Sequence, residues 1–270
     1  MMKYNSLIIM IVVSIQLTGC SHGESFQSGE WIDLSHDFSS ETIYWPTAER
    51  FELEEVSAGY TEQGFYYSAN NFSAAEHGGT HIDAPVHFAE GRRSVDEIPL
   101  ENLIAPAVVI DLSEKVSADR DYQVKVEDFL KWEAKNGNLS DGVIVLLRTG
   151  QGKKWNDPEK YLGTNIRGKE GIAGLHFPGL HPDAARWLVE NRSIKAIGLD
   201  TPSIDFGQST LFESHRILFD KNIPAFVNVA NLDKLPATGS LVVALPMKIK
   251  GGSGAPLRIV AFVPKENSRY

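Results

Sequence analysis

Seven short apolar runs and three helical patterns most constrain how this chain can fold. The runs are rich in valine and isoleucine, and their length and composition predict β-strands. The predicted strands are residues 31–34, 107–112, 142–148, 196–200, 225–229, 241–248 and 257–263. The predicted helices are residues 124–136, 181–191 and 211–222. Strands and helices alternate in the middle, whereas the last strands follow one another. This order predicts a single mixed α/β domain and not an all-parallel doubly wound sheet.

Residues 35–88 contain few strand or helix signals and carry many aromatic side chains. Long stretches without regular structure inside a compact domain are usually functional loops. Trp45 and Phe65 could form an aromatic wall for a flat substrate, and they could equally belong to the core. The sequence therefore predicts functional loops here and leaves the role of both rings open.

The first residues have the pattern of a secretory signal. Lys3 gives a positive start, residues 7–15 are almost entirely apolar, and the sequence Leu-Thr-Gly-Cys ends at Cys20. This pattern is typical of a signal peptide, and the apolar run is shorter than the about 20 residues that a membrane span requires. We therefore expect a signal peptide over 1–19, a polar tether over 20–29 and one folded domain over 30–270.

The Leu-Thr-Gly-Cys ending resembles the bacterial lipobox, which implies that Cys20 is lipidated and anchors the chain to a membrane. Ser21 follows, and not aspartate, so the resemblance implies the outer membrane of the cell envelope, with the domain facing the periplasm. Cys20 is the only cysteine, so the chain can form no internal disulfide and the folded domain has no thiolate ligand. The formal net charge of -9 disfavours nucleic acid as a partner, because phosphates repel an acidic surface.

The stretch "HGGTHIDAPVHF" at residues 77–88 concentrates potential metal ligands. His77 and His81 are four apart, so one helical turn would place both imidazoles on the same side. Asp83 could reach the same point if extended chain follows, since Pro85 discourages a continuing helix. Two histidines and one carboxylate leave open positions on a divalent metal, and His87 suits a general base beside it. A surface loop with scattered histidines is the alternative, but four such groups within eleven residues favour a metal site.

The same stretch fits the pattern H-x-G-T-H-x-D-x-P-x-H and resembles the cyclase-like metal-dependent hydrolases, a family that includes kynurenine formamidase and isatin hydrolase. The resemblance extends over roughly residues 31–264 and includes "HFPGLHPDAARWL", "GLDTPSIDFGQS", "ESHRILFDKNIPAFVN" and "LPMKIKGGSGAPLR". These four segments, with "YWP" at 44–46, are more similar to isatin hydrolase than to the formamidase. The resemblance implies a swivelling β/β/α domain with a mixed sheet, usually as a homodimer.

Position by position, the resemblance implies that His77, His81 and Asp83 bind the metal. It implies that His87 donates and accepts the proton of the reaction. These roles agree with the ligand pattern of the stretch itself, in which a basic group lies just beyond the ligands.

Two further positions bear on the number of metal ions. His215 matches a ligand of the second metal in the two-zinc formamidases, whose bridging glutamate falls at Val227 here. Valine cannot bind a metal, so the resemblance implies one divalent ion, Mn²⁺ rather than Zn²⁺, although a second ion stays open. His215 and Gln208 would then face the substrate or support the site. Ligand counting alone accepts manganese, zinc or iron.

Other motifs are less specific. No G-x-S-x-G elbow occurs, which disfavours a serine hydrolase. The segment "KIKGGSGAP" at 248–256 lacks the spacing of a phosphate-binding loop, and we expect a tight turn between the last two strands. Asp200 and Asp205 follow a predicted strand and could cap turns or orient histidine ligands.

The resemblance implies a metal-dependent amidohydrolase that opens a cyclic amide, an isatin-like lactam or imide, as its small-molecule substrate. An arylformamidase acting on a substrate of the N-formylkynurenine type is one alternative. A non-catalytic lipoprotein that binds a metal or a small ligand is another. The presence of His87 favours an enzyme, because a binding protein needs no group that transfers protons.

Overall fold

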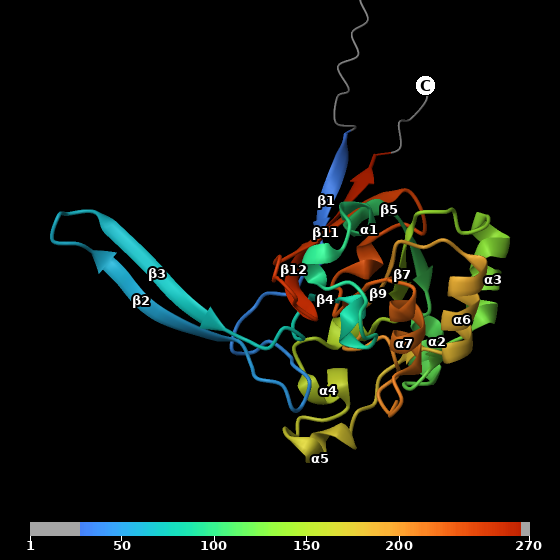
Figure 1. The fold of residues 1–270 in the computed structure, drawn as a ribbon, viewed down its shortest axis with the longest axis horizontal. Coiled ribbons are helices and arrows are strands. Elements are labelled where there is room, and N and C mark those ends of the chain that lie inside the picture. Colours follow the sequence, from blue (N-terminus) through green and yellow to red (C-terminus); the bar gives the residue numbers. More distant parts are fainter. Residues whose placement is uncertain (1–27, 266–270) are drawn as a thin grey trace, which may run out of the picture.

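A closed, barrel-like mixed sheet forms the centre of the computed structural model, which describes residues 28–265 (Figure 1). Its strands are β1 (Gly29–Asp33), β4 (His81–Asp83), β5 (Ile104–Asp111), β7 (Ile144–Arg148), β9 (Ala196–Leu199), β10 (Ala225–Val227), β11 (Ser240–Pro246) and β12 (Gly254–Pro264). They pair in the order β1–β12–β11–β5–β7–β9–β10–β4, and β4 also pairs with β12, which closes the ring. All of the predicted strands are confirmed, as is the mixed α/β class.

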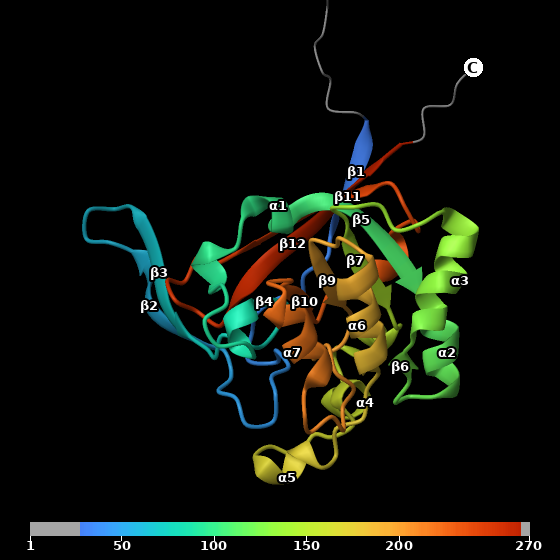
Figure 2. The same cartoon turned by 45° about the vertical axis from the view of Figure 1, so that its right-hand side comes forward.

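Three helices cover the outer face of the parallel part of the barrel (Figure 2). These are α3 (Val126–Asn136), α6 (Pro182–Asn191) and α7 (Glu213–Asp220), as predicted. Strands β5, β7, β9 and β10 run parallel to one another. Parallel strands covered on both faces read as continuous apolar runs, and "IVLL" at 144–147 is buried throughout. The outward side chains of these strands and the inner faces of the helices form one core cluster.

The remaining elements are short. They are α1 (Leu100–Leu103), α2 (Ser113–Ala118), α4 (Pro158–Leu162), α5 (Lys169–Ile172), the strand pair β6 (Gln123–Val124) and β8 (Gly179–Leu180), and single 3₁₀ turns at Pro85–His87, Val95–Glu97, Gln151–Lys154 and Leu232–Lys234.

Alternation along β4 decides which way the candidate ligands point. Ile82 faces its cross-strand partners Phe226 and Ala255, and all three pack in the core cluster inside the barrel. Successive side chains on a strand point to opposite faces. His81 and Asp83 therefore point outward, to the side covered by α7. Burial of Ile82 thus fixes the direction of two candidate metal ligands.

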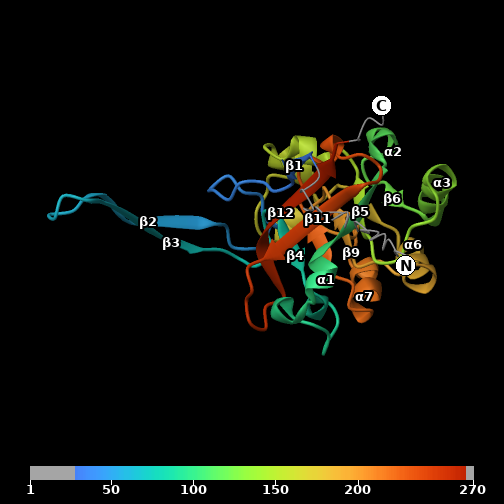
Figure 3. The ribbon, with the colours of Figure 1, turned by 90° about the horizontal axis from the view of Figure 1, so that it is seen from above.

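A long hairpin projects away from the barrel (Figures 1 and 3). It consists of β2 (Glu52–Tyr60) and β3 (Tyr66–Ser73), with a bulge between Glu55 and Ser57. Most of its side chains on both faces are exposed. The prediction of loops throughout 35–88 is wrong here. Because neither face packs on the core, no apolar alternation is required, and the sequence lacks the signal that identifies buried strands.

The predictions about the N-terminus are not tested. The signal peptide, Cys20 and all but the last residues of the tether lie outside the described residues, and Gly29 already belongs to β1. Within residues 28–265, no helix is long and apolar enough to cross a membrane.

Candidate metal centre and active-site pocket

Asp83 is the centre of the site. Its carboxylate is almost completely buried and has three imidazoles around it. Oδ1 lies 2.7 Å from Nδ1 of His77 and 3.2 Å from Nε2 of His81, and Oδ2 lies 3.5 Å from Nε2 of His215. Burial alone would raise the pKa of Asp83, but its contacts with the rings of His215, His77 and His81 outweigh it and hold the pKa well below its usual range. The carboxylate is therefore ionised.

The contacts behind these rings test whether a metal ion fits between them. Nδ1 of His81 lies 2.9 Å from the carbonyl oxygen of Gly79, which can only accept a hydrogen bond. In the neutral ring, Nε2 of His81 then carries only a lone pair, and it faces an oxygen of Asp83 that also offers only lone pairs. Two such atoms at 3.2 Å repel each other unless a positive charge lies beside them. The donor set therefore fits a divalent cation.

The ligands converge by a different route from the one predicted. No helical turn joins His77 to His81, because residues 77–80 form a bend in which Gly78 bridges to Tyr44. A Cβ on Gly78 would come within 1.9 Å of the Tyr44 ring, and Gly79 has a φ of 58°. Only glycine suits both requirements without strain. The bend turns the His77 ring back toward β4, at 84° to the His81 ring and with 5.4 Å between the ring centroids.

His87 ends the 3₁₀ turn at Pro85–His87 and stacks on His77, with ring centroids 3.8 Å apart and planes 19° apart. A nitrogen of His87 lies within 4.8 Å of the ligand atoms of His77 and Asp83. Burial lowers the pKa of His87 to about 4, and this outweighs the attraction of Asp83. The ring is therefore uncharged at neutral pH and can accept a proton. Its position also permits metal binding, so its predicted role in proton transfer stays a prediction.

His215 is held at the start of α7 by Asp205. Nδ1 of His215 lies 2.5 Å from Oδ2 of Asp205, which also accepts hydrogen bonds from the backbone at the start of the helix. Burial lowers the pKa of His215, but the bonds with Asp205 and Asp83 outweigh it, so the pKa is raised. The expectation that Asp205 orients a histidine holds. Asp200 instead binds the backbone of the turn at Thr149–Gly152.

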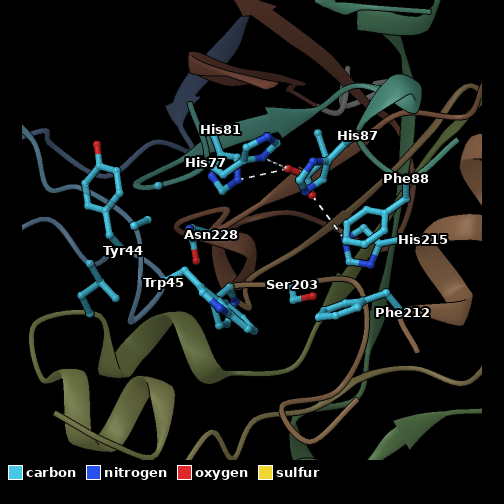
Figure 4. Close-up of a pocket in the computed structure, with 15 residues that line it drawn as sticks. Tyr44, Trp45, His77, His81, His87, Phe88, Ser203, Phe212, His215 and Asn228 are labelled. Carbon is cyan, nitrogen blue, oxygen red and sulfur yellow. Dashed lines mark hydrogen bonds and ion pairs between the residues drawn. The ribbon is translucent and has the colours of Figure 1, made fainter. Parts of the chain in front are cut away.

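A cavity of about 280 Å³ opens beside this cluster. Figure 4 shows the three histidines of the motif on one side, and Trp45, Ser203 and Phe212 on the other. Trp45 therefore lines the pocket, which is one of the two roles that the sequence leaves open. The volume is close to the lower end of the range for small-molecule sites, about 300–1,000 Å³. The pocket thus suits a small and largely apolar ligand.

Two residues that were predicted to belong to the site lie outside the pocket lining. Gln208 is exposed, and its amide contacts His176 on the surface, outside the pocket lining. Phe65 lies in the turn of the projecting hairpin and is 56% exposed. The resemblance implies a role for Gln208 at the site, and the aromatic content of residues 35–88 allows one for Phe65. A turn after Asp205 directs Gln208 away from the cavity. The length of the hairpin places Phe65 far from it.

The lining includes several residues that were not predicted, and three of them are informative. Phe88 follows directly after the motif, and its ring lies 5.1 Å from that of Phe212. Phe212 precedes α7 with a φ of 48°, an unusual conformation for a bulky residue that no sequence pattern signals. Asn228 donates to the carbonyl of Gly79 and accepts from the hydroxyl of Tyr161. In the sequence, the only feature that marks Asn228 is its position next to Val227.

Val227 is the cross-strand partner of His81, so both side chains share the outer face of the barrel. It is fully buried and offers no ligand atom. A carboxylate at this position would point to the same face as His81. The chain therefore has valine where a bridging ligand could reach the site.

The Cyclase family model matches residues 32–206. Isatin hydrolase of Roseibium aggregatum is 33% identical over 242 residues, which cover 87% of each chain. Kynurenine formamidase of Bacillus cereus is 30% identical over 87% of this chain and 98% of its own. The structure of isatin hydrolase A from Labrenzia aggregata bound to benzyl benzoate superposes with a TM-score of 0.79, at 35% identity, over 88% of this chain and 94% of that one.

We expect the protein to bind one Mn²⁺ per chain, because Val227 supplies no bridging ligand. Asp83→Ala should lose the ion, since it removes the carboxylate on which the imidazoles converge. His176→Ala removes a histidine outside the pocket and should keep it. Elemental analysis after Mn²⁺ loading and gel filtration measures the metal content of the wild type and of both variants. Two tightly bound ions per chain would contradict the one-metal site, and an Asp83→Ala protein with full metal content would contradict the centre itself.

Proposed function

This chain belongs to the Cyclase family, and from this premise we propose that it is a metal-dependent amidohydrolase that opens a cyclic amide, such as the lactam ring of isatin. The observation that carries the proposal is the convergence of His77, His81 and Asp83 beside the uncharged ring of His87. These groups border a pocket with aromatic walls. Together they provide what hydrolysis of an amide in a flat ring requires.

His77, His81 and Asp83 would hold the ion. When bound, a divalent ion supplies Lewis acidity toward a carbonyl and lowers the pKa of water. The protein's own part is to keep the three ligands oriented. Asp83 supplies the negative charge, and the carbonyl of Gly79 fixes which nitrogen of His81 faces inward. His215, held by Asp205, restrains the second oxygen of Asp83.

His87 transfers the proton. Water adds its oxygen to the amide carbon, the carbon–nitrogen bond breaks, and the water proton passes through His87 to the leaving nitrogen. When the substrate is a lactam, the product is an amino acid, because the new carboxyl and amino groups stay on the same molecule. An uncharged imidazole inside a pocket suits this role, because it accepts a proton in one step and returns it in the next.

The aromatic lining supports a flat substrate. Trp45, Phe88 and Phe212 border the cavity with few polar groups among them. Rings packed against a planar ligand exclude water and hold it by its faces. The similarity to isatin hydrolase supports the same substrate class. The similarity to kynurenine formamidase keeps a linear arylformamide as the second candidate, which the same catalytic parts could hydrolyse.

We expect the Mn²⁺-loaded protein to open isatin faster than it hydrolyses N-formylkynurenine, because the small pocket suits a compact ring. Product formation from both substrates, with and without prior chelator treatment, measures this. Faster hydrolysis of the formamide would favour the second candidate. No turnover of lactams, imides or arylformamides by the metal-loaded protein would leave a binding protein as the better account.

His87→Ala should keep its metal and its affinity for substrate, because His77, His81 and Asp83 remain in place. The ring-opening rate should fall by about 10²–10⁴-fold, the usual contribution of a positioned acid or base. Metal analysis and single-turnover rates on the same preparation separate these effects. If His87→Ala loses its metal, His87 is a ligand. If it keeps full activity, another group transfers the proton, and His215→Ala is the next variant to measure.

We also propose that the chain forms a homodimer, because two apolar surfaces have no partner within residues 28–265. One is the hairpin face with Leu53, Tyr60 and Tyr66, each more than half exposed. The other is the outer face of β1 and β11, where Trp31 and Leu245 are exposed and the large helices lie on the other side of the barrel (Figure 2). The hairpin points away from its own barrel, and within residues 28–265 nothing covers either surface. Isologous pairing would cover both at once.

Tyr66→Asp should shift the protein from dimer toward monomer, because it places a charge near the hairpin tip beside Tyr60. Burial of an aromatic anchor is commonly worth about 2 kcal/mol or more, so the dissociation constant should rise about 30-fold or more. Asn71→Asp adds the same charge to the other face of the hairpin and should have a smaller effect. Sedimentation velocity measures the oligomeric state of the wild type and of both variants. A wild-type protein that is monomeric at micromolar concentration would rule out the dimer.

A further inference from the structure

The loop before β12 touches the metal centre from behind. Its sequence, Gly251-Gly252-Ser253-Gly254, belongs to the "KIKGGSGAP" segment, and it lies between β11 and β12, as the sequence predicted. The hydroxyl of Ser253 lies 2.9 Å from Nε2 of His77. Nδ1 of the same ring lies 2.7 Å from Asp83. His77 is therefore bound on both sides, by the loop and by the carboxylate.

Glu76 determines the direction of the bond between Ser253 and His77. One oxygen of Glu76, Oε2, lies 2.7 Å from the Ser253 hydroxyl. The same oxygen accepts the backbone N–H groups of Ser253 at 3.0 Å and Gly254 at 3.3 Å. An oxygen that collects three donors is an acceptor. The single proton of the Ser253 hydroxyl therefore points to Glu76.

The position of that proton decides the tautomer of His77. Once the hydroxyl donates to Glu76, its oxygen can only accept from Nε2–H of His77. In the neutral ring Nδ1 then carries no proton, and its lone pair faces Asp83. This matches His81, whose Nδ1–H is bound by the carbonyl of Gly79. Both rings thus present a bare nitrogen to the same carboxylate oxygen.

The glycines around Ser253 make this arrangement possible. A Cβ on Gly254 would come within 2.5 Å of Cε1 of His77, and a Cβ on Gly252 within 2.9 Å of Oε1 of Glu76. The loop is also tied to the ligand strand, because Ala84 N–H donates to the carbonyl of Ser253 at 2.8 Å. The glycines therefore allow the loop to lie against both side chains.

We propose that Glu76 and Ser253 are positioning residues that hold His77 as the Nε2–H tautomer, with Nδ1 directed to the metal ion. The proposal rests on the proposed role of His77 as a metal ligand. Residues that orient a metal-bound histidine from behind typically change metal affinity by about 10–100-fold. Ser253 and Glu76 touch neither the substrate pocket nor the reacting atoms. Their effect is on which nitrogen of His77 faces the ion.

Two measurements test the proposal. The first is the tautomer of His77 in the protein loaded with Zn²⁺, a diamagnetic divalent ion, from ¹H–¹⁵N correlations of the imidazole nitrogens, with the signal assigned by its loss in His77→Asn. The wild type should show Nε2–H. Glu76→Ala frees the Ser253 hydroxyl to donate to Nε2 and should shift the ring toward Nδ1–H, which a merely structural contact would not do.

The second measurement is affinity for Mn²⁺ in competition with a chelator. Ser253→Ala should weaken binding by about 10–100-fold, whereas Ser253→Thr keeps the hydroxyl and should retain the affinity. Ser68→Ala, an exposed serine on the hairpin, is the matched control and should not change it.

The outcomes separate this proposal from the proposed function. A wild type that binds no divalent ion would refute the metal centre and the proposed function with it. A wild type that binds Mn²⁺ but has His77 as Nδ1–H would overturn the positioning role alone. Unchanged affinity in Ser253→Ala would overturn it as well.

Discussion

A buried carboxylate among imidazole rings is the interaction on which the site depends. An isolated charge as deeply buried as Asp83 would cost several kcal/mol, so the groups around it must compensate. Each imidazole around it is held from a different part of the chain. The carbonyl of Gly79 holds His81, the loop before β12 holds His77, and Asp205 holds His215. The barrel, the loop before β12 and helix α7 therefore all hold side chains that surround this carboxylate.

The strands of the barrel could be predicted because burial leaves a pattern in the sequence. A strand covered on both faces must be apolar throughout, as "IVLL" at 144–147 is. The hairpin could not be predicted, because neither of its faces is buried in this chain. Burial of Ile82 also explains why the expected helical turn at His77–His81 is absent. Alternation along β4 places His81 and Asp83 on one face without a helix.

The candidate ligands could be predicted because they lie within a few residues of one another, where spacing constrains geometry. The groups that orient them could not. Ser253 is 176 residues from His77 in sequence, and only the pairing of β4 with β12 brings it to the site. Phe212 is a similar case, since its side chain faces the pocket from an unusual backbone conformation. Gln208 is the reverse case, because it belongs to a segment that carries the resemblance but lies outside the pocket lining.

Closure of the barrel through β4 and β12 has a consequence for the order of assembly. Residues 81–83 pair with residues 254–256, so the ligand strand finds this partner only near the C-terminal end of the chain. Contacts between such distant segments form late and slow folding. A ribosome-bound or truncated chain that ends before β12 contains every candidate ligand but lacks the strand and the serine that set their geometry. Metal acquisition should therefore follow synthesis of the whole domain, and a partly made chain should have little affinity for the ion.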